Sequence, residues 1–282
     1  IMAEFGFEAL DRHHKQSWKR MLKRPQLVRT GQRLTDATPG LTRALQNLLL
    51  DRFAREADHR LNERTPDLVV ANHGWLATAL TRSRRKYGLK VPVVVYATEP
   101  FDASALWAEP QVDEMIAPSL SAREDLVRLG VPATSIRVLG YPVRQAFLKP
   151  PDKAAARAAL DLDANFTCLL SLGAEGVAGE ALSIARLLVE RGHQVLAVAG
   201  RNVTLERALI ELAADNPRLV PFGFTDRMPE LLAAADVVIG KAGPASTMEA
   251  LAVGRPVVVT AFAGLNEERV VRFLETRNLG AY

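Results

Sequence analysis

The chain has 282 residues, of which 48% are hydrophobic and 24% are charged, as in an ordinary globular protein large enough for two hydrophobic cores. Its single cysteine, Cys168, excludes an internal disulfide and gives no sign of a cysteine-based metal site. No apolar run is long enough to span a bilayer and the first residues lack the layout of a signal peptide, so we expect a cytosolic location. The net charge of +4 permits anionic small molecules, an anionic membrane surface or nucleic acid as partners.

The first 65 residues are rich in basic side chains and are predicted to be helical. Apolar residues such as Trp18 alternate with the basic ones, a pattern typical of an amphipathic element on a membrane surface. The alternative is a solvated face of helices that pack on their own domain; a nucleic-acid site is a third interpretation, but no motif supports it. Apolar residues at helical spacing predict a further helix at 41–61. The basic residues are Arg12, Lys15, Lys19, Arg20, Lys23, Arg24, Arg29 and Arg33.

Strands and helices alternate along the rest of the chain. This alternation indicates βα units around mainly parallel sheets, and a proline-rich break at 145–153 separates two such series. We therefore expect an α/β fold of two doubly wound, Rossmann-like domains, 1–144 and 145–282, that face each other across a cleft. Strands are predicted at 67–71, 92–96, 112–117, 136–139, 166–172, 194–200, 218–222, 236–240 and 256–260, and helices at 75–87, 121–129, 179–191, 204–215, 228–235 and 244–252.

The stretch 236–256 carries the most specific signal. A short apolar run is followed by a glycine turn, and Pro244 can take the first helical position, where no N–H group is needed. A helix that starts at the carboxyl end of a buried strand attracts anions through its open N–H groups and its dipole. We expect a phosphate or diphosphate beside Ser246 and Thr247, with Glu249 within reach of a ribose. The alternative is an ordinary βα turn that binds nothing.

The segment KAGPASTMEALAVGRPVVV, residues 241–259, resembles the donor-site signature of the GT-B glycosyltransferases. The resemblance is to the branch that holds the monogalactosyl- and glucosyl-diacylglycerol synthases and the related peptidoglycan-precursor N-acetylglucosaminyltransferase. It implies that Glu249 binds the ribose of a UDP-sugar. It also implies that the preceding turn, with Gly243 and Pro244, binds the diphosphate.

Other segments resemble the same family in the same order. GYPVR at 140–144 resembles the segment at the domain junction, where the fixed charge of Arg144 would suit a diphosphate. Gly173 opens a loop similar to the family's glycine-rich loop, in which backbone approaches the ligand closely. The resemblance places Arg201 in a G-[RK]-N turn and Phe224 in the loop that reads the uracil base. A surface arginine and core packing of the phenylalanine are the alternatives.

GLNEE at 264–268 resembles the loop in which the family carries G-Q-E-x-x-N. Those side chains hold the sugar hydroxyls, so the resemblance assigns Asn266 and Glu267 to the donor sugar. Asn266 stands where the family has Gln.

The first half resembles the acceptor-binding domain of the family. His73 follows a strand as in the family's S-H-P, and 98–107 resembles its T-D…H-x-L-W, with Glu99 in place of Asp and Ser104 in place of His. His73 and Trp107 are therefore expected on the acceptor side; a loop histidine without a ligand is the alternative for His73. The family's candidate base lies in a G-G-G-H loop that this chain lacks, which leaves Glu99 as the nearest carboxylate for that role. Because the chain begins with helix and stops just after a helix, we expect both domains to be incomplete.

The resemblance implies a metal-independent, inverting transferase that moves a hexose from a UDP-sugar to a diacylglycerol-type lipid. No cofactor and no nucleic acid partner are expected, and the protein is expected to lie peripherally on the cytoplasmic face of the cell membrane. Asp161 and Asp163 form a D-x-D, but they lie between a predicted helix and a strand, so we interpret them as a helix end rather than a metal site. The alternatives are N-acetylglucosaminyl transfer to a lipid-linked peptidoglycan precursor, a UDP-sugar epimerase and a non-catalytic nucleotide-sugar-binding membrane protein.

Overall fold

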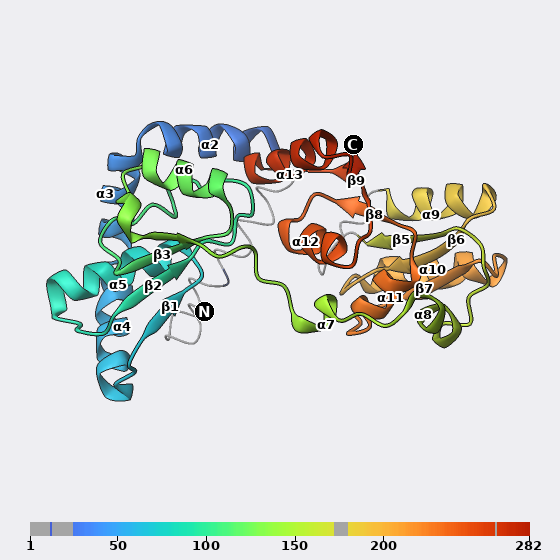
Figure 1. Cartoon of the computed structure of the whole chain (residues 1–282), viewed down its shortest axis with the longest axis horizontal. Coiled ribbons are helices and arrows are strands. Elements are labelled where there is room, and N and C mark those ends of the chain that lie inside the picture. Colours follow the sequence, from blue (N-terminus) through green and yellow to red (C-terminus); the bar gives the residue numbers. More distant parts are fainter. Residues whose placement is uncertain (1–11, 13–24, 172–179, 263) are drawn as a thin grey trace. The chain divides into compact units, whose positions relative to one another are not determined.

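The computed structural model describes residues 12, 25–171, 180–262 and 264–282, which form two compact units (Figure 1). Unit 1 comprises the described residues up to Pro142 together with 264–269. Unit 2 comprises the described residues of 143–262 together with 270–282. Each unit contains its own parallel sheet and therefore its own buried core.

The sheet of unit 1 has four parallel strands in the order β1-β2-β3-β4. The strands are β1 (Val69–Ala71), β2 (Val93–Tyr96), β3 (Glu114–Ala117) and β4 (Ile136–Val138). Helix α5 (Gly74–Tyr87) connects β1 to β2, and α6 (Leu120–Arg128) with a short 3-10 helix (Ala133–Ser135) connects β3 to β4. Val93, Val95 and Met115 are fully buried on one face of this sheet, and the residues that alternate with them along β2 and β3 are partly buried. The connection from β2 to β3 contains no helix.

Three described helices precede this sheet: α2 (Pro25–Ala37), α3 (Pro39–Leu49) and α4 (Asp51–Arg64). The prediction of one helix at 41–61 is wrong, because the chain leaves helical geometry at Leu50, whose buried side chain packs with Phe53 and Ala54. No helix among the described residues combines the length and the apolar character needed to cross a bilayer. The part of the predicted basic segment that lies outside the described residues includes Lys15, Lys19, Arg20, Lys23 and Arg24.

The sheet of unit 2 has six parallel strands in the order β10-β9-β8-β5-β6-β7. The chain starts in the middle of this sheet, adds strands on one side and then crosses to the other side, so the order reverses between β5 and β8. Such a reversal is the point at which open α/β sheets form a ligand crevice. The strands are β5 (Thr167–Ser171), β6 (Gln194–Val198), β7 (Leu219–Phe222), β8 (Val237–Lys241), β9 (Val257–Ala261) and β10 (Gly280–Ala281).

Both ends of the β5–β8 pair are tightly constrained. At one end Gly240 is needed, because a Cβ there would lie 2.0 Å from the carbonyl oxygen of Ser171. At the other end the Asp236 carboxylate accepts a hydrogen bond from the Thr167 N–H (2.8 Å) and forms an ion pair with Arg157 (2.7 Å). Burial alone would raise the pKa of Asp236, but its hydrogen bonds and neighbouring cations hold that pKa below the ordinary value.

The helices of unit 2 depart from the sequence prediction in two places and confirm it in a third. The predicted linker 145–153 contains α7, which is anchored by the fully buried Phe147, and α8 follows it directly. Asp161 takes a left-handed conformation (φ 53°) just past α8, which confirms that the D-x-D marks a helix end. The interpretation of 264–268 as a loop is wrong, because Leu265 begins α13. The helices are α7 (Gln145–Leu148), α8 (Lys153–Ala159), α9 (Ala181–Glu190), α10 (Val203–Ala214), α11 (Met228–Ala234), α12 (Pro244–Ala252) and α13 (Leu265–Thr276).

Candidate active site

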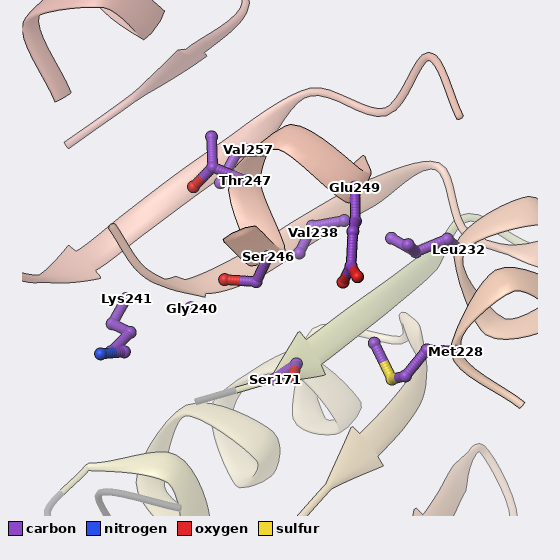
Figure 2. A pocket seen from close by; sticks show the side chains of 10 residues that line it. All are labelled: Ser171, Met228, Leu232, Val238, Gly240, Lys241, Ser246, Thr247, Glu249 and Val257. Carbon is purple, nitrogen blue, oxygen red and sulfur yellow. The ribbon is translucent and has the colours of Figure 1, made fainter. Parts of the chain in front are cut away.

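A pocket lies at the point in unit 2 where the strand order reverses (Figure 2). It is formed by the end of β5, by β8 and by the start of α12, which begins at Pro244 directly after its N-cap residue Gly243. Figure 2 shows the Glu249 side chain extending from α12 toward the strand that carries Ser171. The described lining residues are Ser171, Met228, Leu232, Val238, Gly240, Lys241, Ser246, Thr247, Glu249 and Val257.

The first turn of α12 has the properties of an anion site. Pro244 occupies the first helical position, and the N–H groups that follow it have no partner within the helix. The Ser246 hydroxyl donates to the carbonyl oxygen of Gly243 at 3.1 Å. Thr247 is only 2% exposed, yet its Oγ1 has no hydrogen-bond partner among the residues that the structure describes. An unpaired buried hydroxyl is costly, and here it lies where the helix dipole favours a negatively charged ligand. The arrangement fits a phosphate group.

Glu249 lies one turn further along α12 and is paired with Arg144. The distance from Arg144 Nε to Glu249 Oε1 is 3.7 Å, and the Arg144 guanidinium lies 4.8 Å from the centre of the Phe147 ring. Burial raises the pKa of Glu249, and Arg144 counteracts that rise. The structure therefore brings together Arg144, Thr247 and Glu249 of the predicted donor residues, and places a cation beside the anion site.

Two other predicted donor residues contact each other away from the residues that line this pocket. The Arg201 guanidinium lies 4.3 Å from the centre of the Phe224 ring, which is 57% exposed. Asn202, next to Arg201, caps α10 through its side-chain oxygen, which accepts from the Leu205 N–H. An exposed ring of this kind could stack on a flat aromatic base, so the role of Phe224 in reading uracil stays a prediction. Gly173 lies outside the described residues.

The predicted acceptor residues gather at the carboxyl ends of β1 and β2 in unit 1. His73 caps α5, and its Nδ1 accepts a hydrogen bond from the Trp75 N–H at 3.2 Å, so neutral His73 carries its proton on Nε2. The ring centres of His73 and the buried Trp107 are 6.3 Å apart. Gly74 permits this approach, because a Cβ there would lie 1.9 Å from the carbonyl oxygen of Leu106.

Glu99 belongs to the same region of unit 1 and is contacted by one of the predicted sugar-binding residues. Asn266 Nδ2 donates to Glu99 Oε2 at 2.9 Å. Burial raises the pKa of Glu99, hydrogen bonds from Asn266 and Trp107 lower it, and the nearby Glu267 carboxylate raises it. Asn266 and the buried Glu267 thus belong to unit 1, among acceptor-side residues, and not among the residues that line the pocket of unit 2.

The sequence analysis missed the buried carboxylates beside Glu99. Asp102 is 7% exposed, and its Oδ2 lies 3.4 Å from Arg269 Nε. Within the described part of the chain, its Oδ1 has no hydrogen-bond partner. Burial, followed by the Glu99 charge, raises the pKa of Asp102 to about 7. Arg269 also contacts Asp125 at 2.7 Å. The spacing Glu99-x-x-Asp102 could have indicated the first of these groups. Asp125 and Arg269 come from α6 and α13, and no local pattern connects them.

Metal ligands were not predicted from the sequence. Within the described ranges, no three or more His, Cys, Asp or Glu side chains are arranged to hold a metal ion. The buried Cys168 has its pKa raised to about 11, chiefly by burial, so its sulfur is protonated at neutral pH. The absence of a metal requirement stays a prediction.

Comparisons with solved structures identify the class of fold. MurG from Acinetobacter baumannii matches 82% of this chain and 64% of its own, with a TM-score of 0.58 and 16% identity. A putative UDP-N-acetylglucosamine 2-epimerase from Listeria monocytogenes matches 81% of this chain and 69% of its own, with a TM-score of 0.56 and 16% identity. The chain has the GT-B fold that the sequence predicts, with two α/β units built on parallel sheets.

Comparisons of sequence are more specific. Residues 11–143 match the family model of monogalactosyldiacylglycerol (MGDG) synthase, and residues 171–268 match the C-terminal domain of glycosyltransferase family 28. The predicted resemblance to the diacylglycerol glycosyltransferases is therefore confirmed for most of the chain.

The curated relatives include a monogalactosyldiacylglycerol synthase and a diacylglycerol glucosyltransferase. Monogalactosyldiacylglycerol synthase 1 of Arabidopsis thaliana is 28% identical over 243 residues, which cover 82% of this chain and 45% of that protein. The processive diacylglycerol beta-glucosyltransferase of Bacillus subtilis strain 168 is 26% identical over 220 residues, which cover 77% of this chain and 57% of that protein. The chain thus spans about half the length of the curated relatives it matches.

Proposed function

We propose that the protein transfers a hexose from a UDP-sugar to a diacylglycerol-type membrane lipid, with inversion at the anomeric carbon and without a metal or cofactor. The observation that carries this proposal is the pocket at the start of α12, which is lined by Glu249 and by Thr247, whose buried hydroxyl has no hydrogen-bond partner among the described residues. The names of the relatives that match most of the chain support the choice of donor and acceptor.

In this proposal unit 2 holds the donor. The diphosphate binds at the first turn of α12, where the open N–H groups, the Thr247 hydroxyl and the Arg144 guanidinium face it. Glu249 accepts hydrogen bonds from the ribose hydroxyls. The same groups stabilise the negative charge that develops on UDP as the bond from the anomeric carbon to the diphosphate breaks.

Unit 1 supplies the base. The acceptor hydroxyl loses its proton to Glu99 as its oxygen forms the new bond to the anomeric carbon, and UDP leaves with the electron pair of the broken bond. A base works best when its pKa lies near the working pH, and burial raises the pKa of Glu99 in that direction. Trp107 hydrogen-bonds to Glu99 and His73 lies next to Trp107, so both would contact the acceptor.

The N-terminal helices offer a surface for the membrane. Helix α3 buries the polar side chains of Thr42 and Gln46 and exposes its leucines, which is the reverse of an ordinary surface helix. On α2 the exposed Leu34 follows the exposed Arg33. Apolar side chains next to basic ones fit an anionic lipid surface, so we place the protein peripherally on the cytoplasmic face of the cell membrane. The exposed leucines of α3 are Leu41, Leu45, Leu48 and Leu49.

The membrane surface can be tested by cosedimentation with phosphatidylglycerol vesicles. Replacing Leu45 and Leu49 together by Ser should reduce binding about tenfold or more, because each side chain would bury apolar area in the bilayer. Leu187→Ser, at an exposed leucine of unit 2, is the matched control. Equal binding of both variants would contradict this surface.

The activity is tested with the full-length protein, UDP-glucose or UDP-galactose, and diacylglycerol in anionic vesicles. A new glycolipid together with released UDP is the expected result and identifies the sugar. UDP release without glycolipid would retain the donor site and reject diacylglycerol as acceptor, and a lipid-linked peptidoglycan precursor would be tried next. Binding of UDP without either product would reject the transferase in favour of an epimerase or a binding protein.

A further inference from the structure

The start of α13 makes polar contacts with α2, with α6 and with the loop that carries Glu99. The Leu265 N–H donates to Gln32 Oε1 at 2.8 Å, Asn266 donates to Glu99 at 2.9 Å, and Arg269 contacts Asp125 at 2.7 Å. All of these residues belong to unit 1. The first turns of α13 therefore help to position the residues around Glu99, the proposed base.

The Asn266 amide is hydrogen-bonded to Glu99 at one end and lies close to Gly264 at the other. Its Nδ2 donates to Glu99, and its Oδ1 lies over Gly264, where a Cβ would come within 2.6 Å of that oxygen. A side chain at position 264 would displace the amide, so Gly264 is part of the arrangement. An amide held in this way is directed at Glu99 and does not line the donor pocket of unit 2.

Glu99 needs this support because its other neighbours disfavour its charged form. The Glu267 carboxylate on α13 and the Asp102 carboxylate in the same loop both interact with it, and burial removes water from it. A cation of this region, Arg269, forms ion pairs with Asp102 and Asp125. Asn266 and Trp107 are the two neighbours whose hydrogen bonds favour the ionised carboxylate.

We propose that Asn266 is a positioning residue that holds Glu99 ionised and oriented as the proton acceptor, and that it does not act as a contact to the donor sugar. This inference rests on the proposed transferase activity. It differs from the role that the family resemblance implies for Asn266, and it assigns the start of α13 to the acceptor side of the reaction.

The test compares Asn266→Ala and Asn266→Asp with the wild-type protein in two measurements. The first is the dependence of kcat on pH at saturating UDP-sugar. Loss of one hydrogen bond to a charged carboxylate should move the acidic limb of the profile upward by about one pH unit, and further for the Asp variant, which adds a like charge. The donor KM should stay within about twofold. Asn266→Gln, which keeps the amide, should restore part of the shift.

The second measurement is an NMR titration of the side-chain carboxyl carbons in the ligand-free protein. The Glu99 resonance should titrate at higher pH in Asn266→Ala than in the wild type. Glu275→Ala, at an exposed position further along α13, is the matched control and should leave the Glu99 resonance in place. Trp107→Phe removes the other donor and should shift Glu99 in the same direction.

The two proposals can fail separately. An acidic limb that stays in place while the donor KM rises tenfold, or while the preference between UDP-glucose and UDP-galactose changes, would overturn the positioning role and restore the sugar contact. A wild-type protein that transfers no sugar would reject the proposed function. In that case a Glu99 titration that does not respond to Asn266→Ala would overturn the positioning role as well.

Discussion

The pocket of unit 2 and the carboxylate cluster of unit 1 lie at equivalent edges of two parallel sheets but have opposite electrostatic character. The pocket combines a helix N-terminus with the guanidinium of Arg144. In the cluster Arg269 pairs with Asp102 and Asp125, and burial raises the pKa values of Asp102 and Glu99. The comparison teaches that the same edge of a parallel sheet can favour a bound anion in one unit and a protonated carboxylate in the other.

The largest expected effect comes from Glu99→Gln, which removes the base but keeps the shape of the side chain. We expect kcat to fall by roughly 10²–10⁴-fold, the usual contribution of a general base, while the affinity for UDP stays unchanged. Steady-state kinetics and calorimetric titration with UDP measure the two quantities. A kcat within tenfold of the wild-type value would show that unit 1 does not supply the base through Glu99.

Replacing Asp102 by Asn tests the electrostatic character of the carboxylate cluster, and the quantity measured is the free energy of unfolding. The pKa of Asp102 is raised from 3.8 to about 7 in the folded protein, so the folded state binds more protons than the unfolded state between about pH 4 and pH 7. The free energy of unfolding that Asp102 contributes therefore falls as pH rises through this range. The Asn variant cannot ionise and should be more stable than the wild type at pH 8, by up to roughly 4 kcal/mol, with no gain at pH 4. Urea unfolding at both pH values measures this difference, and an equal gain at the two pH values would contradict the prediction.

In unit 2, Glu249→Ala should weaken UDP binding by about 10–100-fold, because the ligand loses its hydrogen bonds to a partly buried carboxylate. The fold should stay intact, since Glu249 is paired only with the exposed Arg144 at 3.7 Å. Calorimetric titration with UDP measures the affinity. Glu230→Ala, which removes another carboxylate of unit 2, is the control and should bind UDP normally. Unchanged affinity in the Glu249 variant would reject the donor site.

Thr247→Val is expected to have the smallest effect, with opposite signs for binding and stability. The valine keeps the shape of the side chain and removes a buried hydroxyl that has no partner in the protein, so the ligand-free variant should be at least as stable as the wild type. UDP affinity should fall by about tenfold, because the phosphate loses one hydrogen bond. Thermal unfolding with and without UDP measures both quantities. A variant that loses stability but not affinity would show that Thr247 serves the core.

The two regions also differ in how far the sequence could predict them. In the pocket, Pro244, Thr247 and Glu249 lie within six consecutive residues of one βα unit, so the sequence alone places them on the same short helix. The prediction of a loop at 264–268 was wrong because the first turn of α13 is polar and was interpreted through the family pattern. The short linker helix α7 was missed because the burial of Phe147 is a property of tertiary packing.

The sequence by itself determined the alternation of strands and helices, the GT-B fold and the start of α12 at Pro244, because each depends on patterns within a few tens of residues. Only the tertiary structure decided that Asn266 contacts Glu99, that Asp102 is buried beside it and that Arg269 contacts Asp125. These groups come from segments separated by up to 167 residues. Their protonation depends on burial and on neighbouring charges, and both are fixed only when the chain has folded.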